Sequence, residues 1–99
     1  MSEVLIDYYK AIEESSRKML EAAKVENWDQ VVRYEGACAV LIEQLRFKSQ
    51  QQELSPEHRP EKARIMQRIL RNDAQIRNLA EPWLTQCEQM FDVQAQQMH

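Results

Sequence analysis

The stretch ENWDQVVRYEGACAVLIEQL, residues 26–45, decides the fold of this chain. Asn27 can cap a helix, and Gln30 stands three residues later, where its side chain can complete a capping box. The positions that follow recur at alternating steps of three and four residues, the spacing of a helix that packs along one seam. A helix is therefore predicted over residues 28–48. Its seam positions are Trp28, Val31, Glu35, Cys38, Ile42 and Leu45.

A second helical stripe precedes Asn27, and a helix is predicted over residues 3–25. Because the connection between the two segments is short, they are expected to lie side by side and antiparallel. The segments thus predict a helical hairpin with a defined register. Its expected pairs are Met19 with Val31, Ile12 with Cys38, Tyr8 with Ile42, and Leu5 with Leu45.

One layer of this predicted seam is polar, because Ser15 or Ser16 faces Glu35. A buried carboxylate needs hydrogen-bond partners, and the two serines are able to supply them. In the alternative, which we favour, Glu35 lies at the rim of the seam with its carboxylate in water. The serines then only fill the space between two close helices.

The second half of the chain is predicted to add two helices. Residues 49–60 are polar, contain two of the three prolines, and form the longest linker. A third helix is predicted over residues 60–80, and Pro82 then favours a restart, so a fourth is predicted over residues 82–97. The expected fold is one all-α domain, residues 1–99, in which a hairpin and two further helices form a small helical bundle.

Composition excludes several classes of function. With 99 residues, 43% apolar content and a net charge of −3, the chain suits one small core and disfavours binding to a phosphate backbone. No stretch approaches the roughly 20 apolar residues that cross a bilayer, and no basic region opens a secretory signal. We therefore expect a cytoplasmic protein that binds no nucleic acid and does not insert into membranes.

No residue set supports catalysis, a cofactor or a metal. Cys38 and Cys87 lack CxxC spacing, so both are expected to be buried, reduced thiols. His58 and His99 have no ligand-like spacing with either cysteine. A phosphate-binding loop is not possible with a single glycine, and no nucleophile and base can be paired. We therefore predict that the protein is not an enzyme.

The predicted third helix has more apolar surface than one narrow seam can bury. Neighbouring positions differ by about 100° around a helix, so Met66 and Leu70 cannot share the row of Ile65, Ile69 and Ile76. Another surface has to cover Met66 and Leu70. Three are open: the fourth helix, through Trp83 and Met90; a partner helix; and a second copy of the chain. Two interpretations remain open for the arginines of this helix, an acidic partner or an ordinary solvated face. These arginines are Arg64, Arg68 and Arg71, and Arg59, Lys62 and Arg77 lie nearby.

Two stretches resemble the FliT family of flagellar export chaperones. Residues 15–23, SSRKMLEAA, with Trp28, Asp29 and Glu35, are similar to the first hairpin of that family. Residues 69–73, ILRND, with Ile76 and Arg77, are similar to its third helix. The resemblance covers most of the chain up to about Leu79.

This resemblance implies a cytoplasmic chaperone that holds the carboxy-terminal helical region of the filament-cap protein FliD before export. It also implies contact with the export ATPase complex and, in some relatives, with a flagellar transcription regulator. The family's exposed apolar pair and basic residue correspond here to Met66, Leu70 and Arg77. Its last helix can fold back over that surface, a role that would fall to the segment from Pro82 onward.

The expected function is thus binding of FliD by a helix-in-groove contact. The expected partner-binding residues are Ile65, Met66, Ile69, Leu70, Arg77 and Trp83. The alternative from the residues alone is a structural helical module whose surplus apolar surface is buried in a homodimer, without chaperone activity.

Overall fold

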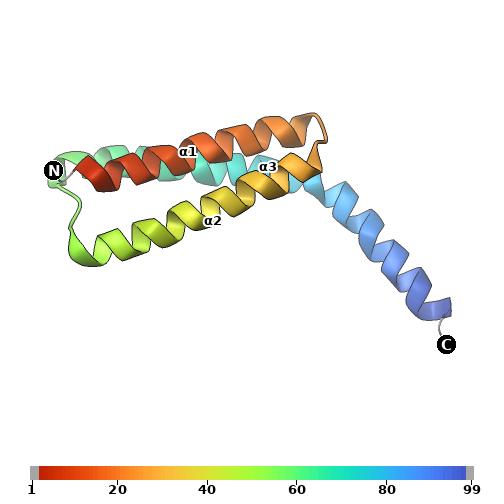
Figure 1. The fold of residues 1–99 in the computed structure, drawn as a ribbon. Coiled ribbons are helices and arrows are strands. Elements are labelled where there is room, and N and C mark those ends of the chain that lie inside the picture. Colours follow the sequence, from red (N-terminus) through yellow and green to blue (C-terminus); the bar gives the residue numbers. More distant parts are fainter. Residues whose placement is uncertain (1–2, 98–99) are drawn as a thin grey trace.

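The computed structural model describes residues 3–97, with side-chain surroundings described for residues 5–82, 85 and 89. The chain folds into three α-helices and one short 3-10 helix (Figure 1). These elements are α1 (Glu3–Lys24), α2 (Trp28–Gln51), η1 (Pro56–His58) and α3 (Arg59–Gln97). The predicted all-α class is confirmed. None of the described helices combines the length and apolar character needed to cross a bilayer.

The turn between α1 and α2 satisfies the free backbone groups of both helix ends. The N–H of Glu26 donates to the Ala23 carbonyl at 3.0 Å, and that of Asn27 to the Ala22 carbonyl at 2.9 Å. Glu26 adopts a left-handed backbone with φ 59, so the turn has the hydrogen bonds of a Schellman motif. The Asn27 side chain then accepts from the Gln30 N–H at 3.3 Å and caps α2, as predicted.

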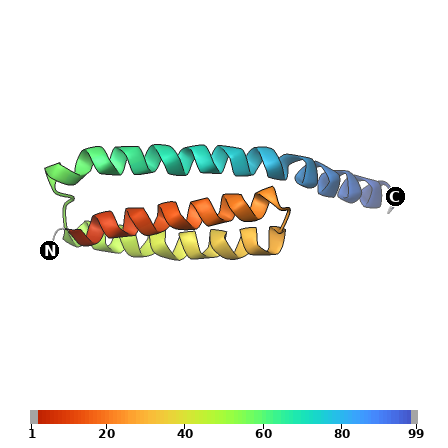
Figure 2. The same cartoon turned by 90° about the horizontal axis from the view of Figure 1, so that it is seen from above.

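α1 and α2 lie side by side and run in opposite directions (Figures 1 and 2). At the turn, Met19 and Val31 pack against the same core cluster, and at the far end Leu5 and Leu45 line one cavity. In the polar layer, Ser15 hydrogen-bonds with Cys38. Glu35 is exposed, which agrees with a carboxylate in water at the rim of the seam.

α3 lies on another side of α1 and runs parallel to it, as its polar contacts show. The Ser16 hydroxyl, 5% exposed, accepts from the Asn72 amide at 3.0 Å and donates to the Glu13 carbonyl at 2.8 Å. Two ion pairs precede this contact along both helices, Lys10 with Glu61 and Glu13 with Arg68, each at 3.4 Å. Because the residue numbers rise together on α1 and α3, the two helices are parallel.

The core belongs to α1 and α3. Among the described residues, α2 contributes no fully buried side chain. α2 and α3 each pack along α1 but make almost no close approach to one another, so α1 lies between them (Figure 2). The buried apolar side chains are Leu5, Ile6, Ile12, Leu20, Ala22 and Ala23 of α1 with Ile65 and Ile76 of α3.

The predicted fourth helix is wrong, because α3 continues through Pro82 to Gln97. Proline has no N–H for the Asn78 carbonyl, which favours a bend rather than a straight helix. Both residues are exposed, so water can solvate the freed carbonyl and the helix is not forced to end. Near this point α3 changes direction and its carboxy-terminal part leaves the other helices (Figures 1 and 2). The described helices therefore do not form the expected four-helix bundle.

Replacing Pro82 with alanine should straighten α3 and stabilise its carboxy-terminal half. The change restores the N–H that donates to the Asn78 carbonyl, and proline costs about 3 kcal/mol relative to alanine in a helix interior. We expect Pro82→Ala to increase the helical circular dichroism signal and the midpoint of thermal unfolding. Gln89→Ala, at an exposed position of the same segment, is the control and should change the circular dichroism signal and the midpoint little. If Pro82→Ala raises these two values no more than Gln89→Ala does, the prediction is wrong.

Candidate partner-binding groove

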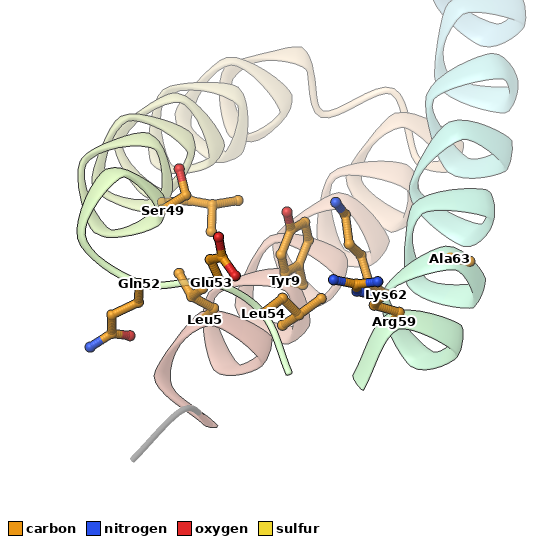
Figure 3. A pocket seen from close by; sticks show the side chains of 10 residues that line it. Leu5, Tyr9, Ser49, Gln52, Glu53, Leu54, Arg59, Lys62 and Ala63 are labelled. Atoms are coloured by element: carbon orange, nitrogen blue, oxygen red, sulfur yellow. The ribbon is translucent and has the colours of Figure 1, made fainter. Parts of the chain in front are cut away.

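A groove of about 610 Å³ opens where the three helices meet at the amino-terminal end of α1 (Figure 3). The groove exists because α2 and α3 both pack against α1 but not against each other. The residues that line it are Leu5 and Tyr9 of α1, Leu45, Ser49 and Gln52 at the end of α2, Glu53 and Leu54 of the connection, and Arg59, Lys62 and Ala63 of α3. A lining that mixes apolar, polar and charged side chains suits a partner segment of mixed character.

One wall continues along α3 as an exposed apolar stripe. Ala63 lines the groove, and Met66 and Leu70 follow it at steps of three and four residues, which places them on the same face of the helix. Met66 is 37% exposed and Leu70 is 62% exposed. We call these two side chains the α3 stripe. α2 does not cover them, because it hardly approaches α3.

The opposite wall continues along α2. Seven residues before Ser49 the same face carries Ile42, which is 38% exposed, and seven residues before that it carries Glu35, which is also exposed. This wall offers less apolar surface than α3 does. The groove and both extensions therefore form one elongated face between α2 and α3.

The structure places the predicted partner-binding residues in different surroundings. Ile65 is buried at 3% exposure and Ile69 is half-buried, so both pack toward α1. Arg77 is exposed and pairs with Asp73 at 2.9 Å, two turns beyond Leu70. The side chain of Trp83 lies outside the described side chains, as do those of Cys87 and Met90. Among the described members of the predicted set, Met66 and Leu70 are the large apolar side chains that stand exposed.

The sequence indicated that α3 is basic but not that Arg59 and Lys62 lie at the closed end of a groove. Lys62 is half-buried, and its ammonium lies 5.4 Å from the centre of the Tyr9 ring, a cation–π distance. Arg59, Glu53 and Leu54 complete this end. These residues show no helical period in common, because they come from a linker and two helices, and only the fold brings them together.

The arginine row of α3 lies on the other side of that helix. Arg64 and Arg68 border a recess of about 290 Å³ shared with Lys10 and Glu13 of α1. Arg64 and Arg68 are both exposed, and Arg68 pairs with Glu13 at 3.4 Å. Exposed pairs of this kind add little stability. The row therefore does not line the groove.

Among the described residues, the remaining candidate groups lie apart from one another. Cys38 is a free, half-buried thiol. Burial raises the pKa of this thiol, and the hydrogen bond with Ser15 works in the opposite direction. His58 lies 3.1 Å from the Ser55 hydroxyl in the connection. In the described part of the chain, no three His, Cys, Asp or Glu side chains gather as metal ligands would.

Ile65 and Leu70 should differ sharply in their contribution to stability. Ile65→Ala removes buried methyl groups and should lower the free energy of unfolding by about 2 to 5 kcal/mol. Leu70→Ala removes an exposed side chain and should lower it by less than about 1 kcal/mol. Urea unfolding followed by circular dichroism measures both. A loss for Leu70→Ala as large as that for Ile65→Ala would assign Leu70 to the core.

Comparison with known families identifies the chain. Residues 6–97 match the sequence model of the family described as flagellar protein FliT. No curated protein and no solved structure matches the chain. The match covers nearly the whole sequence, and the family consists of chaperones rather than enzymes. The chain therefore belongs to the FliT family of flagellar proteins, with the role in flagellar export that this family implies.

Proposed function

We propose that this protein is a cytoplasmic chaperone of flagellar type III export that binds the carboxy-terminal helical region of the filament-cap protein FliD. The proposal rests on family membership and on one observation, the α3 stripe. Met66 and Leu70 stand exposed on the face that continues from the groove, although each is apolar. Adjacent apolar side chains left in water on a helix of a small protein favour a binding surface.

The proposed contact is a helix laid along the face between α2 and α3. A partner helix with apolar residues at steps of three and four would place them against Met66 and Leu70 on one side and Ile42 on the other. Burial would contribute about 25 cal/mol for each Å² of apolar surface removed from water. The bound helix would fill the space that α2 and α3 leave open, so the complex would acquire the closed packing that the chain lacks alone.

The other predicted residues have supporting roles in this proposal. Ile65 and Ile69 would hold α3 in place from the α1 side, and Arg77 would contact polar groups at the rim. Trp83 would extend the surface beyond the bend at Pro82. Contact with export ATPase components and with a flagellar transcription regulator is part of the proposal and is supported by the family alone.

One observation favours the alternative, a homodimer without chaperone activity. Outside the groove, α2 carries three large exposed apolar residues, Val32 at 62%, Val40 at 57% and Phe47 at 59%. A second copy of the chain would cover such a row. Sedimentation equilibrium at several concentrations separates the alternatives, because a tight dimer that fails to bind FliD favours the structural module.

The α3 stripe should carry much of the affinity for the FliD helix. Truncating a central apolar contact typically costs about 1 to 2 kcal/mol of binding free energy, so Met66→Ala and Leu70→Ala should each weaken binding roughly tenfold. Isothermal titration calorimetry with a synthetic peptide of the FliD carboxy-terminal helix measures this.

Val40→Ala is the matched control, because Val40 is exposed on α2, does not line the groove, and lies about 160° around the helix from Ile42. It should leave the affinity unchanged. If Leu70→Ala and Met66→Ala bind as tightly as the unaltered protein, the stripe is not the docking surface.

A further inference from the structure

We propose that the face between α2 and α3 binds its partner helix in one direction only, with the carboxy-terminal end of that helix in the groove beside Arg59 and Lys62. The inference rests on the proposed function, because it concerns the helix that the chaperone would hold. It follows from where the groove closes and from how charge is distributed along its walls.

The groove is the closed end of the face. Residues 52–55 connect the end of α2 to η1, and Glu53 and Leu54 of this connection line the cavity (Figure 3). A helix that lies along Leu70 and Met66 toward this end meets the connection and has to stop there. The groove therefore receives an end of the partner helix and not its middle.

Uncompensated positive charge gathers at this end. Arg59 and Lys62 line the groove from α3, and among the described residues neither forms an ion pair. Glu53 lies across the cavity from them and is not close enough to pair with either. Two cations against one anion leave this end positive in a protein whose net charge is −3.

Contact with Tyr9 holds one of these cations in the groove. The Lys62 ammonium lies 5.4 Å from the centre of the Tyr9 ring, and Tyr9 forms part of the floor. This contact restricts the lysine side chain, so less conformational entropy is lost when an anion binds. Lys62 is half-buried, which weakens the screening of its charge by salt.

The two ends of an α-helix differ in charge. The carboxy-terminal end exposes carbonyl groups and carries about half a negative charge, whereas the amino-terminal end exposes N–H groups and carries about half a positive charge. Arg59 and Lys62 can donate hydrogen bonds to free carbonyls and to carboxylates of the last turn. An amino-terminal end in the same place would bring like charges together.

Farther along the face the charge has the opposite sign or is cancelled. Glu35 on the α2 wall is exposed and has no ion-pair partner among the described residues. On the α3 wall, Asp73 and Arg77 neutralise each other at 2.9 Å. This half of the face therefore suits the amino-terminal end of the partner helix. A helix bound in this direction runs parallel to α2 and antiparallel to α1 and α3.

Paramagnetic labels on the peptide of the FliD carboxy-terminal helix test the direction. A nitroxide at its carboxy-terminal end should broaden the amide resonances of Ser49 and Lys62, which border the groove. A nitroxide at its amino-terminal end should instead broaden those of Val31 and Ile76, which both lie at the core cluster near the turn of the hairpin. The reverse pattern, or broadening of both regions by either label, would overturn the inference.

Charge-reversal variants test whether Arg59 and Lys62 set the direction of the bound helix. The double variant Arg59→Glu with Lys62→Glu should weaken peptide binding at least about tenfold at low salt. This variant should stay folded, because glutamate in the first turn of α3 is compatible with the helix dipole. Arg64→Glu with Arg71→Glu makes the same change in net charge away from the groove and should change affinity less than about twofold.

The outcomes separate the two proposals. Equal losses in both double variants would overturn the assignment of direction to Arg59 and Lys62, while binding itself would still support the chaperone function. A peptide that does not bind the unaltered protein at all would overturn the proposed function and, with it, this inference.

Discussion

The structure depends on α1 packing against two helices, α2 and α3, at once. Its buried side chains are not confined to one stripe, since Ile6 and Ala22 point about 160° apart when each residue turns the helix by 100°. α2 packs on one of these sides and α3 on another. Removing either α2 or α3 would expose part of α1 to water. α2 and α3, in contrast, bury almost no surface against each other. The open face between them is a direct result.

Polar contacts fix how α3 sits on α1. Apolar burial alone tolerates sliding along a helix, but the hydrogen bond between Asn72 and the buried Ser16 hydroxyl is satisfied in one register. That register brings Ile76 against Leu20 and Ala23, and it sets Arg59 and Lys62 beside the floor of the groove. The position of the binding surface thus depends on a small polar contact in the core.

The first helices could be predicted closely, and the carboxy-terminal half could not. Asn27 and the three-and-four spacing after it gave the cap and the extent of α2, because capping and helical period are local properties. Pro82 predicts a helix boundary, but a proline bends an exposed helix without ending it when the freed carbonyl stays solvated. Helical spacing places Met66 and Leu70 in a different row from Ile65, and both are exposed as this separation predicts.

The sequence by itself determined α1 and α2, the turn between them, and the separation of the α3 stripe from the core row, since each depends on residues close together in the chain. Only the tertiary structure decided that α3 runs parallel to α1, that Ser16 pairs with Asn72, and that the groove joins residues of three helices and a linker. These contacts link residues far apart in the chain, and their free energy depends on burial and geometry that exist only once the helices have packed.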